Sequence, residues 1–201
     1  MPELSVTWIE YNVQSLLTDL RQGKLGLPEF QRGWRWTSTR IRDYLDSLYR
    51  QYPSGILLLW EPLDREDLNL RDFAIDSDNG FPADRLQYLV LDGQQRLTSL
   101  WKVFEGDVPM RFNPLQETFQ SENAANRRSP DWLPVWEALK WDIDEADEEL
   151  EQRFSRERRR DVRKALAKLQ KIREYPYRAY VLKTDDYEAV VESFIRVNSG
   201  V

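Results

Sequence analysis

The sequence predicts an α+β fold, in which a small mixed sheet is packed against helices. Two apolar runs have the length of buried strands, at residues 55–60 and 86–91. The segments around them carry apolar residues at every third or fourth position, which is the helical period. Hydrophobic residues make up 41% of the chain and charged residues 32%, a composition that buries a core. We predict a single domain over residues 1–201, with its longest helix as an appendage.

The first helix is expected over residues 12–22. Asn12 is suited to cap its start and Gly23 to end it. Its apolar face consists of Leu16, Leu17 and Leu20. A short extended segment over 24–30 follows and is interrupted by Pro28. A polar and aromatic loop then leads to the second helix.

The second helix is expected over residues 39–51, with Thr37 or Ser38 as its cap. Its apolar face consists of Ile41, Tyr44, Leu45 and Leu48. After the buried strand at 55–60, residues 61–84 are acidic and rich in Asp, Asn, Gly and Pro. We therefore predict a long, solvated surface loop there.

The remaining elements follow from the same patterns. The longest helical signal covers residues 144–173, acidic in its first half and basic in its second, which complements the helix dipole. The other expected elements are a strand over 86–91, a helix over 94–105, a hairpin over 108–121, a polar loop over 122–131, a short helix over 133–140, a strand over 176–182 and a helix over 186–197.

The chain contains no histidine and no cysteine, which narrows its chemistry. Zinc sites built on those residues are excluded, and so are Ser-His-Asp and Cys-His nucleophile systems within this chain. Carboxylate, guanidinium, amide and hydroxyl groups remain. They suit phosphate handling with an oxygen-bound divalent metal, and they equally suit binding without catalysis.

Localisation and charge are also constrained. No run approaches the ~18 apolar residues of a membrane span, and the N-terminus does not have the pattern of a signal peptide. We therefore expect a cytoplasmic protein with no membrane partner. The formal net charge is -6, so contact with DNA would require a local basic patch.

The most informative stretch is the motif Asp92-Gly93-Gln94-Gln95-Arg96, between a predicted strand and a predicted helix. It places a carboxylate, two amides and a guanidinium at a helix N-terminus, where backbone N–H groups and the dipole favour phosphate. The motif is neither a Walker loop nor a dinucleotide-binding glycine pattern. A purely structural interpretation is also open, in which Asp92 caps the helix and pairs with Arg96.

Three segments of the chain resemble the N-terminal domain family of GmrSD-type restriction endonucleases. They are LPEFQRGWRWTSTRIRDYLDSLYRQYPSGILLLW, LVLDGQQRLTSLW and FIRVNSG. The resemblance implies a ParB/sulfiredoxin-like fold that binds and hydrolyses a nucleoside triphosphate in modification-dependent restriction and anti-phage defence. It also implies DNA, modified DNA above all, as a partner, and a histidine-dependent nuclease domain or subunit that this chain does not contain. The chain then looks like the N-terminal portion of a longer protein or like a truncated gene product.

The resemblance points to Gln31, Arg32, residues 92–96 and Asn198, and the chemistry of the turn suggests roles for its residues. Asp92 would bind Mg²⁺ or orient the attacking water, and Arg96 would hold phosphates. Gln94 or Gln95 would position water or contact the base. The expected catalytic residues are Asp92, Gln95 and Arg96, and the expected nucleotide-binding residues are Gln31, Arg32, Gly93, Gln94, Arg96, Thr98 and Asn198.

Simpler interpretations of the outlying residues remain open. Arg32 could form a surface salt bridge, and Asn198 could cap the last helix. The strongest local basic patch contains Arg158, Arg159 and Arg160, which would contact DNA or form a solvated face with Glu–Arg pairs.

The leading function is therefore nucleotide hydrolysis that regulates DNA restriction. A non-catalytic, nucleotide-gated DNA-binding switch is the alternative. Direct phosphodiester cleavage is a third possibility, and without histidine it would need a carboxylate–metal site.

Overall fold

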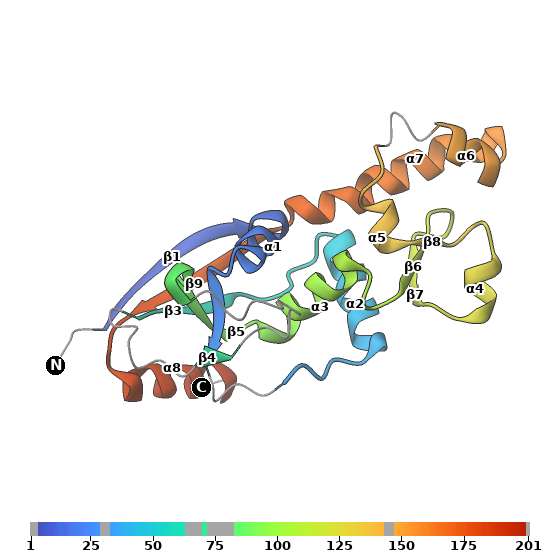
Figure 1. Ribbon diagram of the computed structural model, residues 1–201. Coiled ribbons are helices and arrows are strands. Elements are labelled where there is room, and N and C mark those ends of the chain that lie inside the picture. The colour runs from blue at the N-terminus through green and yellow to red at the C-terminus, as the bar shows by residue number, and fades with distance from the viewer. Residues whose placement is uncertain (1–3, 29–32, 63–69, 72–82, 143–146, 200–201) are drawn as a thin grey trace. The chain divides into compact units, whose positions relative to one another are not determined.

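The computed structural model describes residues 4–28, 33–62, 70–71, 83–142 and 147–199 (Figure 1). The chain forms two compact units. The first comprises Met1–Trp34, Gly55–Thr98 and Pro176–Val201, and the second comprises Arg35–Ser54 and Ser99–Tyr175. Each unit combines helices with strands, which confirms the predicted α+β class.

A mixed sheet forms the centre of the first unit. Among the described residues its strand order is β1-β9-β3-β5-β2-β4. These strands are β1 (Ser5–Asn12), β9 (Pro176–Lys183), β3 (Leu57–Glu61), β5 (Tyr88–Asp92), β2 (Leu25–Pro28) and β4 (Leu70–Arg71). The β9–β3 and β5–β2 pairs are parallel, and the other pairs are antiparallel. Strands β5 and β2 therefore end at the same edge of the sheet.

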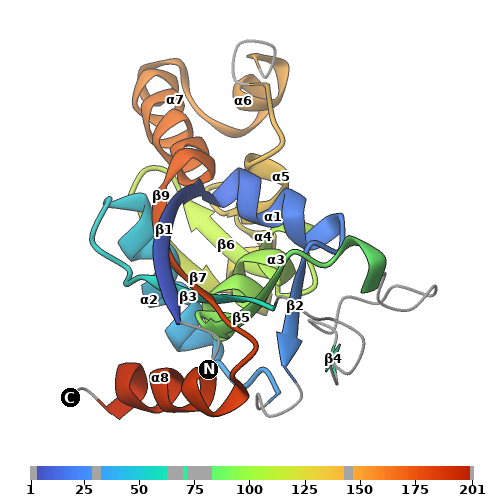
Figure 2. The ribbon, with the colours of Figure 1, turned by 90° about the vertical axis from the view of Figure 1, so that its left-hand side faces the viewer.

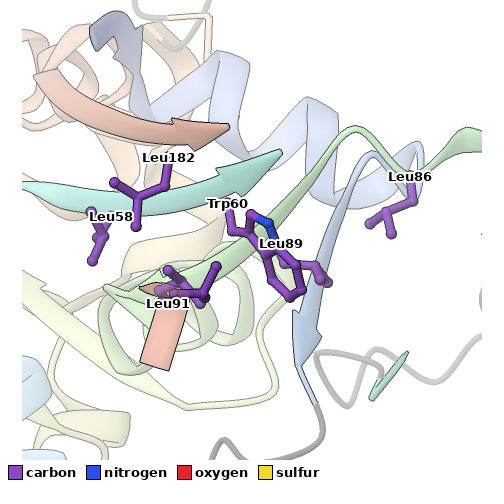
Figure 3. Packing of buried hydrophobic residues seen from close by; sticks show 7 residues of the cluster. Leu58, Trp60, Leu86, Leu89, Leu91 and Leu182 are labelled. Carbon is purple, nitrogen blue, oxygen red and sulfur yellow. The ribbon is translucent and has the colours of Figure 1, made fainter. Parts of the chain in front are cut away.

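Helix α8 (Tyr187–Ser199) covers one face of this sheet, and α1 (Val13–Arg21) lies on the opposite side (Figures 1 and 2). Val190 and Phe194 of α8 pack on strand residues. The other members of this cluster are Leu86, which precedes β5, and the strand residues Leu58, Trp60, Leu89, Leu91 and Leu182 (Figure 3). Trp60 also donates from Nε1 to the Thr184 carbonyl at 2.8 Å, so its polar atom is satisfied inside the core.

The predicted cap of the first helix is confirmed. The Asn12 Oδ1 atom accepts from the Ser15 backbone N–H at 2.7 Å, and Ser15 Oγ accepts from the Asn12 N–H at 3.0 Å. This reciprocal capping box satisfies two N–H groups that the first turn cannot pair within the helix. Gly23 follows the helix with φ +70°, as its predicted role at the helix end requires.

The second unit is built on a smaller sheet with the order β7-β6-β8. Its strands are β6 (Met110–Asn113), β7 (Thr118–Ser121) and β8 (Leu133–Pro134), and β6 with β7 forms the predicted hairpin. Helix α2 (Ser38–Tyr49) belongs to this unit and begins after Thr37, whose side chain accepts from the Arg40 N–H. The rings of Tyr49, Phe112 and Phe119 pack together, with centroids 4.9–5.7 Å apart.

The prediction of one long helix over residues 144–173 is wrong. Its described part consists of α6 (Asp147–Arg153), α7 (Arg156–Gln170) and a 3₁₀ segment, η2 (Lys171–Glu174). Ser155 has extended backbone angles, φ -63° and ψ 155°, and the preceding Phe154 is buried. Ser155 occupies the N-cap position of α7, where serine is a preferred residue, and a charge pattern alone does not signal such a break.

Two smaller predictions also need correction. Residues 122–131 are not a loop throughout, because α4 (Ala124–Arg128) begins there with a capping box between Asn123 and Asn126. The helix expected over 133–140 starts later, since Leu133–Pro134 pairs with β6 and α5 covers only Val135–Ala138.

Most of the predicted loop 61–84 lies outside the described residues. Its described parts include β4 and the start of the 3₁₀ turn η1 (Ala83–Arg85).

A charged cluster in the second unit fixes the end of the hairpin turn. Glu117 Oε2 accepts from the Tyr49 hydroxyl and from Lys168 Nζ, each at 2.9 Å. The Lys168 ammonium also lies 4.2 Å from the centroid of the Tyr49 ring. The hydrogen bonds from Lys168 and then from Tyr49 lower the pKa of Glu117, while burial and the Glu117 carboxylate raise that of Tyr49.

This cluster predicts a loss of stability in acid. Because the pKa of Glu117 is lower in the folded state, its stabilisation is present above the unfolded value of about 4.3. It is lost as the pH falls through the folded-state pKa. We expect Glu117→Gln to flatten the decline of the urea midpoint below about pH 4. Glu148→Gln, which removes an exposed glutamate of α6, serves as the control; an equal flattening in both variants would contradict the prediction.

Candidate functional site

The motif at residues 92–96 forms the turn between a strand and a helix, as the sequence predicts. Strand β5 ends at Asp92, and α3 covers Gln94–Glu105, which are the predicted helix bounds. Gly93 connects them with φ +105°, a conformation that side-chain-bearing residues rarely adopt. The first helical hydrogen bond runs from the Leu97 N–H to the Gly93 carbonyl at 3.0 Å. The three N–H groups before it point toward the N-terminal end of α3.

Arg96 holds this turn together. Its Nη2 atom donates to Asp92 Oδ2 at 2.9 Å and to the Ile56 carbonyl at 2.6 Å. The Arg96 side chain is 13% exposed and that of Asp92 is 32% exposed, so the ion pair is largely but not fully withdrawn from water. The structure therefore contains the Asp92–Arg96 ion pair that the purely structural interpretation of the motif predicts.

Two glycines leave the space that this arrangement needs. A Cβ atom on Gly55, which has φ +92°, would collide with Arg96 Nη1. One on Gly93 would collide with Cδ2 of Leu57, the first residue of β3. The turn and the start of β3 therefore approach each other more closely than side chains at these positions would allow.

The two glutamines lie in different surroundings. Gln95 Nε2 donates to the Gly33 carbonyl at 3.2 Å, while Gln94 is only 6% exposed. Thr98, one turn further along the helix, is 2% exposed, and its Oγ1 has no hydrogen-bond partner within the described chain. Gln94 and Thr98 are four residues apart and share one side of α3.

The other predicted nucleotide-binding residues are less well placed by the structure. Gln31 and Arg32 lie outside the described residues. Pro28 at the end of β2 and Gly33, which contacts Gln95, are the nearest described residues on either side. Asn198 belongs to the last turn of α8 rather than following the helix, and its side chain is not described. The roles of these three residues stay predictions.

Comparison with known proteins decides the family. The GmrSD restriction endonuclease N-terminal domain family matches residues 13–201. The chain belongs to this family. An uncharacterized protein of Methanocaldococcus jannaschii, MJ0686, is 30% identical over 105 residues. This match covers 50% of the present chain but 18% of the relative, so the chain spans less than a fifth of that protein's length.

The donor groups of this GmrSD-type domain bear on the predicted Mg²⁺ site. The hydrogen bond from Arg96 to Asp92 uses Oδ2. No hydrogen bond from a described residue reaches Oδ1 of this carboxylate. No group of three or more acidic side chains in the described ranges is arranged to enclose a metal ion. One carboxylate is compatible with Mg²⁺, which is commonly held by one or two carboxylates together with substrate phosphates and water.

The structure separates the three arginines that were predicted to contact DNA. Successive residues of a helix point about 100° apart, so Arg158, Arg159 and Arg160 do not share a face of α7. Arg159 pairs with Glu151 of α6 and is partly buried, whereas Arg158 and Arg160 are exposed.

Among the described helices, none combines the length and apolar character of a membrane span.

The sequence interpretation missed the contribution of the segment before β3. Ile56 supplies the carbonyl that binds Arg96, and Gly55 supplies the space for the guanidinium. The available signal was Gly55, a glycine directly before an apolar run. Arg96 lies 40 residues after Ile56 in the sequence, and only the fold shows that the two residues are in contact.

Proposed function

We propose that the turn after β5 binds the phosphates of a nucleoside triphosphate and that this domain hydrolyses the nucleotide. The observation that carries the proposal is a partly exposed carboxylate, Asp92, held in place at the N-terminus of a twelve-residue helix. The helix dipole favours phosphate at this end. Gly93 lets the turn lie close against Leu57 of β3, which holds Asp92 and the helix N-terminus in place.

Asp92 has the central role in this proposal. Its Oδ2 is fixed by Arg96, which leaves Oδ1 to hold Mg²⁺ or to orient a water molecule. Bound Mg²⁺ would neutralise charge on the phosphates. Arg96 acts first as a positioning residue, because Nη2 already donates to Asp92 and to Ile56. Gln94 and Gln95 would contact the nucleotide or the water from the first turn of α3.

Family membership supports a wider role in DNA restriction. We infer that nucleotide binding and hydrolysis regulate a histidine-dependent nuclease domain or subunit, with modified DNA as the substrate. Anti-phage defence, a cytoplasmic location and the ParB/sulfiredoxin-like fold belong to the same proposal.

The decisive experiment measures phosphate release from ATP, GTP, CTP and UTP with Mg²⁺, with and without DNA. We expect turnover of at least one nucleotide and a loss of about 100-fold or more in Asp92→Asn, as is typical when a transition-state contact is removed. Asp107→Asn, which changes an exposed carboxylate beyond the other end of α3, should retain full turnover.

The other outcomes have defined meanings. Saturable nucleotide binding without turnover would favour the nucleotide-gated DNA-binding switch, which needs no hydrolytic centre. Equal losses in both variants, or neither binding nor turnover, would refute the proposed role of Asp92. Nicking of plasmid DNA by the domain alone with Mg²⁺ or Mn²⁺ would indicate direct phosphodiester cleavage instead.

A further inference from the structure

Positive charge is concentrated on one short part of this acidic chain. The full sequence has 29 lysine and arginine residues against 35 acidic residues. Residues 156–173, which form α7 and the start of η2, contain nine of these cations and only two acids, Glu157 and Asp161. An attraction for anions that the whole chain lacks is therefore available locally on this helix.

The apolar residues of α7 determine which cations face outward. Val162, Ala165, Leu166 and Leu169 are buried and form one side of the helix. At 3.6 residues per turn, the opposite side carries Arg156, Arg160, Lys164 and Lys171, all of which are exposed. We call these four residues the basic face. With a rise of about 1.5 Å per residue, it extends along about 22 Å of helix.

Other cations of the helix are engaged within the second unit. Arg159 pairs with Glu151 of α6, which lies beside α7 in both ribbon views (Figures 1 and 2). Lys168 contacts Glu117 and the Tyr49 ring. By contrast, no ion pair with a described residue engages Arg156, Arg160 or Lys171. Lys164 makes one exposed contact, to Asp161 at 3.7 Å.

We propose that the basic face binds the phosphate backbone of double-stranded DNA. Charge complementarity identifies the partner, because a row of exposed cations about 22 Å long matches a duplex with regularly repeated phosphates. The row consists of cations, which bind phosphates in any sequence, and it lacks the Asn and Gln side chains that recognise adenine, so we expect it to position the duplex rather than to recognise its sequence. This inference does not depend on nucleotide hydrolysis at the turn after β5.

The test compares two variants of the full chain with the same change in charge. The first carries Arg156→Gln, Arg160→Gln and Lys171→Gln. The control carries Arg42→Gln, Arg85→Gln and Arg128→Gln, which change exposed arginines that do not belong to the basic face. Binding to a 30-base-pair duplex is measured between 50 and 200 mM salt. Three lost phosphate contacts should reduce the slope of log K against log salt by about 2.7.

Each outcome bears on the proposal. A flatter slope and at least tenfold weaker binding in the first variant, with a wild-type slope in the control, would support it. Equal changes in both variants would indicate a general charge effect and overturn it. Failure of the wild-type chain to bind the duplex would also overturn it. Polyglutamate that competes as strongly as DNA at the same concentration of negative charge would overturn it too, because the basic face would then suit an acidic protein. Circular dichroism confirms that both variants fold.

Discussion

Gly93→Ala is expected to destabilise the protein by about 2–4 kcal/mol, because the new Cβ meets two independent obstacles. The backbone at this residue has φ +105°, which disfavours any residue with a side chain. The added atom would also collide with Leu57, a fully buried residue of β3. A shift of the turn would carry Asp92 and Arg96 with it, so nucleotide turnover should decrease as well. Urea denaturation followed by tryptophan fluorescence measures the stability.

Gly33→Ala is the matched control for this prediction. Gly33 is exposed, and a Cβ built on it has no neighbour within 4 Å. We expect its free energy of unfolding to stay within about 0.5 kcal/mol of the wild-type value. Similar destabilisation at both positions would show that the tight approach of the turn to β3 is not the cause.

The local part of the site could be predicted from the sequence. Four apolar residues followed by Asp92 and Gly93 indicated a strand and a turn, and the period of Leu97 and Leu100 indicated the helix. The structure gives α3 the predicted bounds. This succeeded because the strand, the glycine and the helical period all lie within one short stretch, where local preferences agree.

The contacts that hold the site could not be predicted in the same way. The acceptor for Arg96 is a backbone carbonyl of Ile56, and every residue has such a group, so no side-chain pattern identifies it. The parallel pairing of β2 with β5 likewise joins segments that are far apart in the sequence. Long-range pairing of this kind depends on how whole elements pack.

The charged helix shows a different limit. Charged residues are frequent from 144 to 173, acidic in the first half and basic in the second, and helix propensity alone favours continuity. The extended conformation of Ser155, the N-cap residue of α7, interrupts the helix instead. The same structure shows that Arg159 and Arg160 have different surroundings although they are neighbours in the sequence. Counting charges in a sequence window therefore located the basic region but not its exposed face.

Arg96→Met is expected to reduce stability by about 2–4 kcal/mol, because it removes two hydrogen bonds from a charged donor. Asp92 would lose its ion partner and Ile56 its contact with the guanidinium. Arg50→Met is a suitable control, since Arg50 pairs with Asp46 at the same four-residue spacing but with side chains 37% and 36% exposed. Loss of that exposed pair should cost less than about 1 kcal/mol.

A double-mutant cycle with Asp92→Asn then separates the two roles of Arg96. If Arg96 acts by positioning Asp92, its substitution should reduce turnover strongly in the wild-type background and little once Asp92 has been replaced. Nucleotide affinity measured without turnover should then change only slightly. If Arg96 also contacts phosphate directly, affinity should fall by the same factor in both backgrounds. Additive losses of turnover with unchanged nucleotide affinity would contradict both roles. The effect of Arg96 on turnover would then depend neither on Asp92 nor on contact with the phosphates.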